Sequence, residues 1–334
     1  MNLEGYRKVF RDIVEAKTRA VIEDKTYYIK HLSALDQVDI DDIKKKYYDN
    51  AISRGIPAQK DILKRLSDEG DWTPENEKEI KRQEAFIEQL QKNKTQLVLK
   101  SQIDQQNQTI QETRKKINEL IGKKRALMGV NAEDYSDKRA NDFYVIKSFY
   151  EDSGMEKPVF PNQQDFDDLY AEEMSLFVNA YNTTFLAFDE LKIQEMILQD
   201  FYYIYFPFSD DTVGFFGKPV CQLTYNQLKL IVYTKIFKNI FENNKHIPQK
   251  IRKDPQALLD FGSISDEAKS KMQEKFDESQ DGSTLFNATD EDFEYAGLEK
   301  PSDKPGISLQ KAAEKKGGSL SMEDLMELSG IPKK

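Results

Sequence analysis

Histidine and cysteine side chains are the first places to look for chemistry, and this sequence offers few of them. His31 and His246 are the two histidines, and neither has a Cys or His neighbour at the short spacing that metal sites use. Structural or surface roles account for both rings. We therefore predict no metal-binding residue.

Catalytic and cofactor-binding signatures are also missing from the sequence. It contains no serine nucleophile elbow, no phosphate-binding loop and no dinucleotide-binding glycine pattern. Gly214 and Gly217 enclose two phenylalanines, a spacing too short and too aromatic to cradle phosphates, so we expect a loop over residues 210–219. Acidic residues cluster, as in residues 39–42, but solvated helix starts account for them. We predict no catalytic residue, no cofactor and no enzymatic activity.

An unusually aromatic segment offers binding rather than reactivity. Residues 201–208 are almost all aromatic, and Phe215 and Phe216 follow shortly after. Such a cluster forms either an ordinary core or a docking surface, because aromatic side chains are enriched at the centres of protein interfaces. We keep both alternatives and name Phe215 and Phe216 as candidate partner-binding residues.

A second binding candidate lies near the C-terminal end. From residue 277 onward the sequence is polar and acidic, which is the composition of a disordered or weakly ordered tail. Within it, residues 319–330 predict a short amphipathic helix with Met322, Leu325 and Leu328 as its apolar positions. This helix either binds a groove on a partner or packs back on its own domain.

Residues 75 to 121 contain no glycine or proline, the two residue types that most often interrupt helices. One helix over this stretch would be about 70 Å long at 1.5 Å per residue. Its Ile and Leu residues form two seams that are offset near residues 97–99. The offset fits a stutter in one rod or the turn of a helical hairpin. We expect a continuous or kinked rod, because turn residues are lacking.

The second seam of this stretch contains Ile103, Ile110 and Ile117. A helix with such a sparse seam is not stable on its own. We therefore expect these three residues to pack against another helix or against a second copy of the chain, and we name them as candidate partner-binding residues. Self-association through the long helix is one such arrangement.

Charge and composition bear on partners and location. The formal net charge is −10, the pI is about 5.1 and the mean hydropathy is −0.72. Nucleic-acid binders usually present a basic face, so we expect no nucleic-acid partner. The single cysteine, Cys221, excludes an intrachain disulfide and fits a reducing compartment. The first ten residues lack the apolar segment of a signal peptide, and no apolar run is long enough to cross a bilayer. We expect a cytoplasmic protein without a membrane partner.

These patterns predict a mostly α, elongated protein in four parts. Residues 1–72 form a small α+β region with a β-hairpin. Residues 73–129 form the long helix or helical hairpin, which is coiled-coil-like. Residues 130–276 form a helical, aromatic-rich core domain. Residues 277–334 form the acidic, largely disordered tail with its short terminal helix.

The hairpin around residues 26–33 leads into an acidic helix, and an aromatic helical region precedes a polar tail. With the Lys-, Asn- and Asp-rich composition, this organisation resembles tail and baseplate assembly proteins of large tailed bacteriophages. The resemblance implies a non-enzymatic virion part, or an assembly chaperone that shields an aggregation-prone tail component. Its partners would be other virion or assembly proteins, met in the host cytoplasm and, in a finished particle, in the virion.

Two other functions compete with this one. The first is an intracellular coiled-coil adaptor of cellular origin, in which the rod dimerises and the end helix recruits a client. The second is an enzyme that uses acidic residues of the aromatic domain, between positions 165 and 211.

Overall fold

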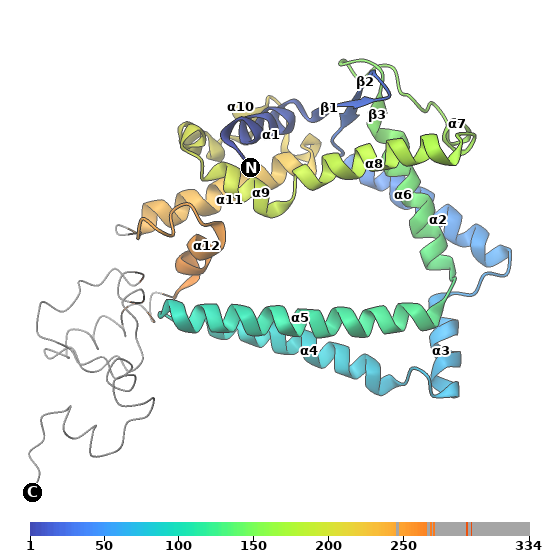
Figure 1. The fold of residues 1–334 in the computed structure, drawn as a ribbon, viewed down its shortest axis with the longest axis horizontal. Coiled ribbons are helices and arrows are strands. Elements are labelled where there is room, and N and C mark those ends of the chain that lie inside the picture. Colours follow the sequence, from blue (N-terminus) through green and yellow to red (C-terminus); the bar gives the residue numbers. More distant parts are fainter. Residues whose placement is uncertain (245–246, 266–267, 269, 271–291, 293–294, 296–334) are drawn as a thin grey trace, which may run out of the picture. The chain divides into compact units, whose positions relative to one another are not determined.

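The computed structural model describes residues 1–244, 247–265, 268, 270, 292 and 295 (Figure 1). The fold is mostly α with a small antiparallel sheet and clustered aromatic side chains, which confirms the predicted class. The chain divides into two compact units, Met1–Gln91 with Thr109–Gly262, and Lys92–Gln108 with Ser263–Lys334. The predicted terminal helix with Met322, Leu325 and Leu328 lies outside the described residues. The predicted tail does as well, except for positions 292 and 295.

The sheet begins next to the first helix. Helix α1 (Leu3–Glu15) leads into strands β1 (Lys17–Ile22) and β2 (Lys25–Lys30), which confirm the predicted hairpin. Glu23 and Asp24 in the turn both have positive φ, as a two-residue type I′ hairpin turn requires. A short third strand, β3 (Phe149–Tyr150), pairs antiparallel with β2, so the strand order is β1-β2-β3.

Helices make up most of the first unit. Besides α1, the long hairpin and the short helices within residues 200–222, they are α2 (Ala34–Ser53), α3 (Gln59–Glu69), α6 (Ala132–Ser148), α7 (Gln163–Asp167), α8 (Ala171–Ala187), α9 (Glu190–Ile197), α11 (Tyr225–Asn243) and α12 (Pro255–Ser263), whose last residue belongs to the second unit. Local sequence sets several of their starts. Ser33 and Asp36 form a capping box at the start of α2, and Thr224 forms one with Gln227 at α11. Asn131 caps α6 by accepting a hydrogen bond from the amide of Asp134.

The main core lies against the inner face of the sheet. Ile29 and Phe149 are almost completely buried there, and Phe177 of α8 meets Phe149 edge-on with ring centroids 5.1 Å apart. Phe160 lies 5.0 Å from Phe177 in a similar T-shaped arrangement. Edge-to-face contacts of this kind stabilise beyond the area they bury.

The stretch expected to be a continuous or kinked rod is a helical hairpin, so that expectation is wrong. Helix α4 (Pro74–Lys94) ends before α5 (Lys100–Met128) begins, and the two run antiparallel (Figure 1). The turn needs no glycine, because the amides of Gln96 and Leu97 donate to the carbonyls of Asn93 and Lys94. The offset between the two apolar seams marks this reversal of the chain.

Contacts between α4 and α5 within the first unit show why the hairpin is favoured. Ile80 of α4 and Ile117 of α5 lie in one core cluster, and Lys124 Nζ lies 2.7 Å from Glu77 Oε1. Each helix thus covers the sparse apolar stripe of the other.

In the second unit, Asp292 stands at the start of α5. Its fully buried carboxylate accepts hydrogen bonds from the amide and the hydroxyl of Ser101 at 2.8 and 3.0 Å. A carboxylate at a helix N-terminus satisfies free amides and meets the positive end of the helix dipole.

Candidate functional site

The aromatic run forms η1 (Asp200–Asp210), a 3-10 helix that is anchored on one side. Tyr202 is fully buried, and its hydroxyl lies 2.8 Å from Thr234 Oγ1 on α11. Thr234 donates its own proton to the carbonyl of Leu230 at 2.6 Å, so Tyr202 is the donor in the first bond. Burial raises the pKa of the Tyr202 hydroxyl, which stays protonated and bonded.

Rings from two other helices hold η1 in place. Phe10 of α1 meets Tyr202 edge-on with centroids 5.5 Å apart and lies 4.8 Å from Tyr205. On another side, Phe206 stacks on Phe241 of α11 at 6.1 Å. The core alternative for the aromatic run therefore holds for its inward-facing rings.

Residues 210–219 are not simply the loop that was expected. They contain α10 (Thr212–Phe216), one short helix whose first turn is capped by Asp211 accepting from the Gly214 amide at 2.9 Å. Gly217, at φ 65°, ends it in the left-handed conformation. The Asp cap and the glycine stop were the signals in the sequence that could have identified this helix.

The predicted binding residues Phe215 and Phe216 lie on α10 and are half-buried. The Phe215 ring lies 5.8 Å from Tyr205 and 4.7 Å from Phe216. Phe215 thus joins α10 to η1, and the two phenylalanines are part of the same aromatic assembly as the run 201–208.

Several large apolar side chains of this region are exposed to solvent, including Tyr203, whose ring also packs edge-on against Phe206 at 5.1 Å. They lie on η1, α10 and η2 (Val220–Gln222), and they are Tyr203, Ile204, Phe208, Val213 and Val220, with exposed fractions of 36, 67, 57, 55 and 53%. We call these five residues the η1–η2 surface. Exposed apolar residues scattered singly need no explanation, whereas a group in one short segment is typical of an interaction site. Sequence patterns missed Val213 and Val220 as site residues, because the short helices α10 and η2 that carry them were not predicted.

An ion pair lies at each end of η1. Lys253 Nζ lies 3.3 Å from Asp200 Oδ1 at the start, and Lys238 pairs with Asp210 at the end. The hydrogen bond from Lys238 holds the pKa of Asp210 below its usual range. The apolar segment therefore has charged groups at both of its ends, as interface rims do.

The predicted partner-binding residues of the second seam are covered by the chain itself. Ile103, Ile110 and Ile117 are buried, and Ile117 packs with Ile62, Leu66 and Trp72 in one cluster. Ile117 therefore packs against other helices of the same chain. In this structure none of the three side chains is exposed to a partner.

The residues considered for chemistry have structural partners. His31 is buried, with Nε2 2.9 Å from Thr18 Oγ1 and its ring against Phe188. His246 lies outside the described residues. Among the acidic residues between 165 and 211, Asp167 pairs with Arg139 at 2.8 Å. Within the described part of the chain, no group of three or more His, Cys, Asp or Glu residues is placed to hold a metal ion.

Comparisons with known proteins add no relative. No protein-family model, curated protein sequence or solved structure matches the chain. Among the helices of the described residues, none combines the length and the apolar character needed to cross a bilayer.

Proposed function

We propose that this chain is a non-enzymatic assembly protein that binds another protein through the η1–η2 surface. The observation that carries the proposal is the set of five exposed apolar side chains on a frame of buried aromatic rings. Following the resemblance to tail and baseplate assembly proteins of tailed bacteriophages, we propose that the partner is a virion or assembly protein of such a phage.

The energetics of the surface support binding. Fully burying one Val, Ile or Phe side chain contributes about 1.5–3 kcal/mol. Association also costs free energy for each side chain and loop that must be ordered. Here Tyr202 and Phe206 fix η1 from within, and Phe215 ties α10 to it. A partner therefore meets a backbone that is already in place.

The two competing functions have less support. Adaptors that dimerise through a rod need an open apolar seam, whereas α4 and α5 pack their seams together within the first unit. An enzyme would need converging carboxylates, whereas Asp167, Asp200 and Asp210 are each paired with a basic side chain.

The single cysteine gives a direct test of the proposal. Cys221 is exposed and follows Val220 of the η1–η2 surface. A photoactivatable crosslinker on a flexible arm would be attached to Cys221, and the protein would be irradiated in an extract of infected cells. We expect mass spectrometry to identify a small set of virion or assembly proteins among the crosslinked products.

Matched variants separate the surface from its surroundings. Ile204→Asp and Phe208→Asp place charges on the η1–η2 surface and should abolish the crosslinks. Val130→Asp makes the same kind of change at a residue that is 77% exposed between α5 and α6, and it should leave them intact. Equal capture by all three variants would rule out the surface. Capture of host regulatory proteins alone would rule out the phage partner.

A further inference from the structure

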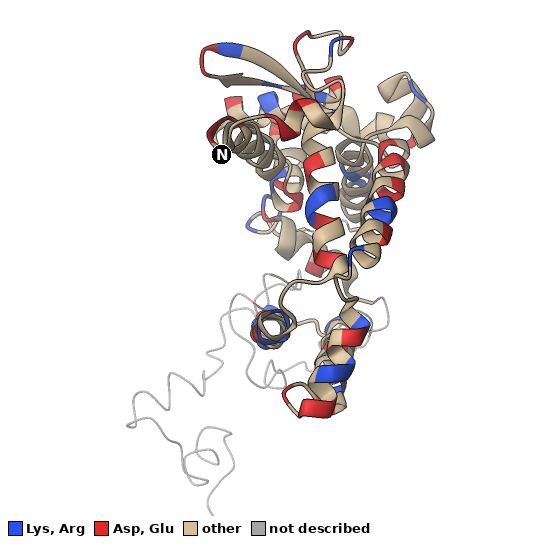
Figure 2. Cartoon of the chain, turned by 90° about the vertical axis from the view of Figure 1, so that its right-hand side faces the viewer, with Lys and Arg blue, Asp and Glu red and all other residues tan. Residues whose placement is uncertain are grey.

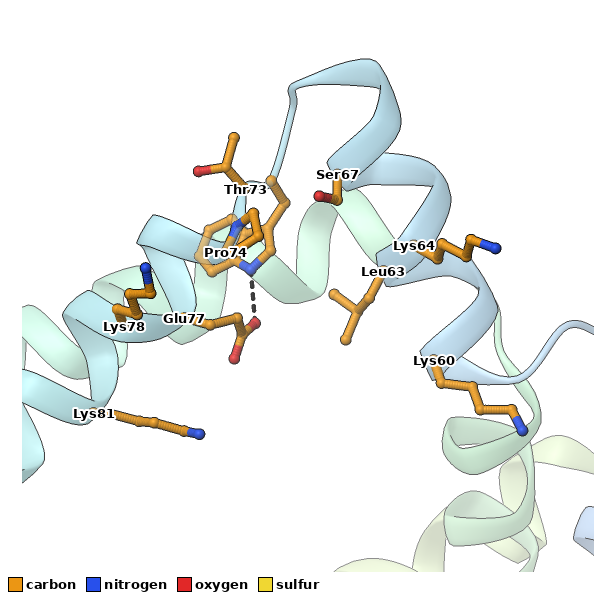
Figure 3. A pocket seen from close by; sticks show the side chains of 10 residues that line it. Lys60, Leu63, Lys64, Ser67, Thr73, Pro74, Glu77, Lys78 and Lys81 are labelled. Carbon is orange, nitrogen blue, oxygen red and sulfur yellow. Dashed lines mark hydrogen bonds between the residues drawn. The ribbon is translucent and has the colours of Figure 1, made fainter.

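A hollow of about 450 Å³ lies between α3 and α4 in the first unit (Figure 3). Its apolar lining comes from Leu63, Trp72 and Pro74. Trp72 is buried, and its Nε1 donates to Glu77 Oε1 at 2.7 Å. Figure 3 shows Leu63 extending from α3 toward the space between the two helices. The hollow therefore has an apolar floor whose one large ring is held in a fixed orientation.

Four lysines surround this floor. Lys60 and Lys64 lie one turn apart on α3, and Lys78 and Lys81 lie one turn apart on α4. Residues three or four apart share a helix face, so each helix contributes two lysines to the rim of the hollow. In Figure 3 the Lys81 side chain extends toward the space between the helices, whereas Lys60 and Lys64 extend outward from the rim. Lys78 pairs with Glu75 at 2.7 Å, but both side chains are exposed and such pairs are weak. Among the described residues, the other three lysines form no ion pair.

Glu77 is the one acidic residue of the lining, and its charge is already matched. Lys124 Nζ of α5 lies 2.7 Å from Glu77 Oε1, the same oxygen that accepts from Trp72. Burial acts to raise the pKa of Glu77, but the hydrogen bonds from Lys124 and Trp72 lower it on balance. The carboxylate is therefore ionised and paired.

The residues that line the hollow carry a net positive charge, whereas the chain as a whole is negatively charged. Figure 2 shows Lys and Arg side by side with Asp and Glu over much of the described chain, and the whole chain has a net charge of −10. Four lysines and one glutamate give the lining a net charge of +3. Positive charges clustered beside an apolar floor are complementary to a negatively charged ligand that also carries an apolar side chain.

We propose that the α3–α4 hollow binds a short acidic, amphipathic helix of a partner protein. The lysine pairs on α3 and α4 flank the acidic residues of that helix. One Leu or Met of the helix occupies the apolar floor against Leu63 and Trp72, as in other grooves that take up an amphipathic helix. A phosphate or a nucleic acid fits less well, because the paired carboxylate of Glu77 faces the same space and the floor is apolar.

The single tryptophan makes the hollow measurable. Trp72 is the only indole in the chain, so its emission reports on this site. The probe is a synthetic helical peptide with Leu at i, i+4 and i+7 and glutamates on both flanks, carrying a fluorescent label. We expect saturable binding by anisotropy, a parallel change in Trp72 emission, and weakening by salt. A peptide with every Glu replaced by Gln should bind about tenfold or more weakly.

Charge-reversal variants test the location. Lys64→Glu combined with Lys81→Glu reverses one charge on each helix and should weaken binding about a hundredfold, since like charges across an interface are strongly unfavourable. The matched control reverses two exposed lysines of α5, Lys115→Glu and Lys123→Glu, and should keep the affinity of the unmodified chain. Melting temperatures show whether each variant is folded, and Lys64→Gln with Lys81→Gln replaces the reversal if it unfolds.

The outcomes are distinct. Equal binding by the reversal variant and its control would overturn the proposal. So would tighter binding of inorganic phosphate or a single-stranded oligonucleotide than of the acidic peptide, with the same dependence on Lys64 and Lys81. Neither result would bear on binding at the η1–η2 surface, which is tested separately by crosslinking through Cys221.

Discussion

Thr18 Oγ1 of β1 lies 2.9 Å from Nε2 of His31, and both side chains are buried. Nδ1 of the same ring has no hydrogen-bond partner among the described residues. Protonating the ring would therefore place a charge in the core with one N–H unpaired. Burial accordingly lowers the pKa of His31 from 6.5 to about 4.

This burial predicts a pH dependence of stability. Between pH 6.5 and 4 the unfolded chain binds a proton on this histidine more readily than the folded chain does. The stability is therefore complete above pH 6.5 and falls as the pH drops toward 4, by about 3 kcal/mol in total at 1.36 kcal/mol per pKa unit. Urea unfolding across this range measures the slope, and His31→Gln should flatten it.

Asp12 provides the control for that experiment. It is also buried, and burial raises its pKa, against the opposing effect of Arg11. The stability that protonated Asp12 contributes is thus greatest below its unfolded pKa of 3.8, and it is lost as the pH rises through the pKa of the folded state. His31 has the opposite dependence, because its contribution is lost as the pH falls. In the Asp12→Asn variant, the free energy of unfolding should still decrease as the pH falls from 6.5 to 5. A slope that survives in His31→Gln would assign the pH dependence to other groups.

The hydrogen bond between Tyr202 and Thr234 should stabilise η1. Thr234→Val leaves the Tyr202 hydroxyl buried without an acceptor, which costs about 1–3 kcal/mol, whereas Tyr202→Phe removes the donor and should cost about 1 kcal/mol. Chemical denaturation of the two single variants and of the double variant measures their coupling. Tyr203→Phe, at an exposed ring of the same segment, should have no effect. Additive effects of the two changes would show that this bond does not contribute.

Arg139 joins α6 to α7 and α2. Its guanidinium donates to both oxygens of Asp167 at 3.1 and 2.8 Å, and it lies over the Tyr47 ring at 5.1 Å from the centroid. Lysine cannot form this two-pronged contact. We expect Arg139→Lys to lower the free energy of unfolding by about 1 kcal/mol, less so in 1 M salt. Lys138→Ala, at the exposed neighbouring position, should change little; a similar loss there would point to α6 itself.

Ile117 gives a test of the α4–α5 hairpin. Because the side chain is buried with Ile80 and Trp72, Ile117→Asp would place a carboxylate in the core and lower the stability by about 3 kcal/mol or more. The mass in solution should not change, since the seam is covered within the chain. Thermal melting and light scattering measure the two quantities, with Lys116→Asp as the exposed control. A lower mass with an unchanged melting temperature would instead place the seam between two copies.

Features set by neighbouring residues could be predicted from the sequence. The caps at Ser33, Asn131 and Thr224 each depend on a side chain and an amide three residues later, so local pattern was sufficient. The β-hairpin was predicted for the same reason. The turn between α4 and α5 was not, because its backbone carries no special residue. Packing of Ile80 against Ile117 makes the reversal favourable, and the offset of the seams near residues 97–99 fits a stutter equally well.

The candidate sites depend even more on distant contacts. Phe10, Thr234 and Phe241 decide which aromatic side chains of η1 turn inward, and therefore which of them remain exposed. Likewise, the hollow between α3 and α4 brings together lysines whose clusters in the sequence are mixed with acids. Composition indicated a binding protein, but the positions of its surfaces are determined by tertiary packing.

The third strand has a consequence for synthesis on the ribosome. β1 and β2 are complete at Lys30, but β3 and the covering ring of Phe177 come much later in the chain. At about 5–20 residues per second, roughly 6 to 24 seconds separate translation of Lys30 from translation of Tyr150. During that interval the nascent hairpin lacks Phe149 and Phe177, so the core face around Ile29 stays uncovered and accessible to chaperones until the middle of the protein has been made.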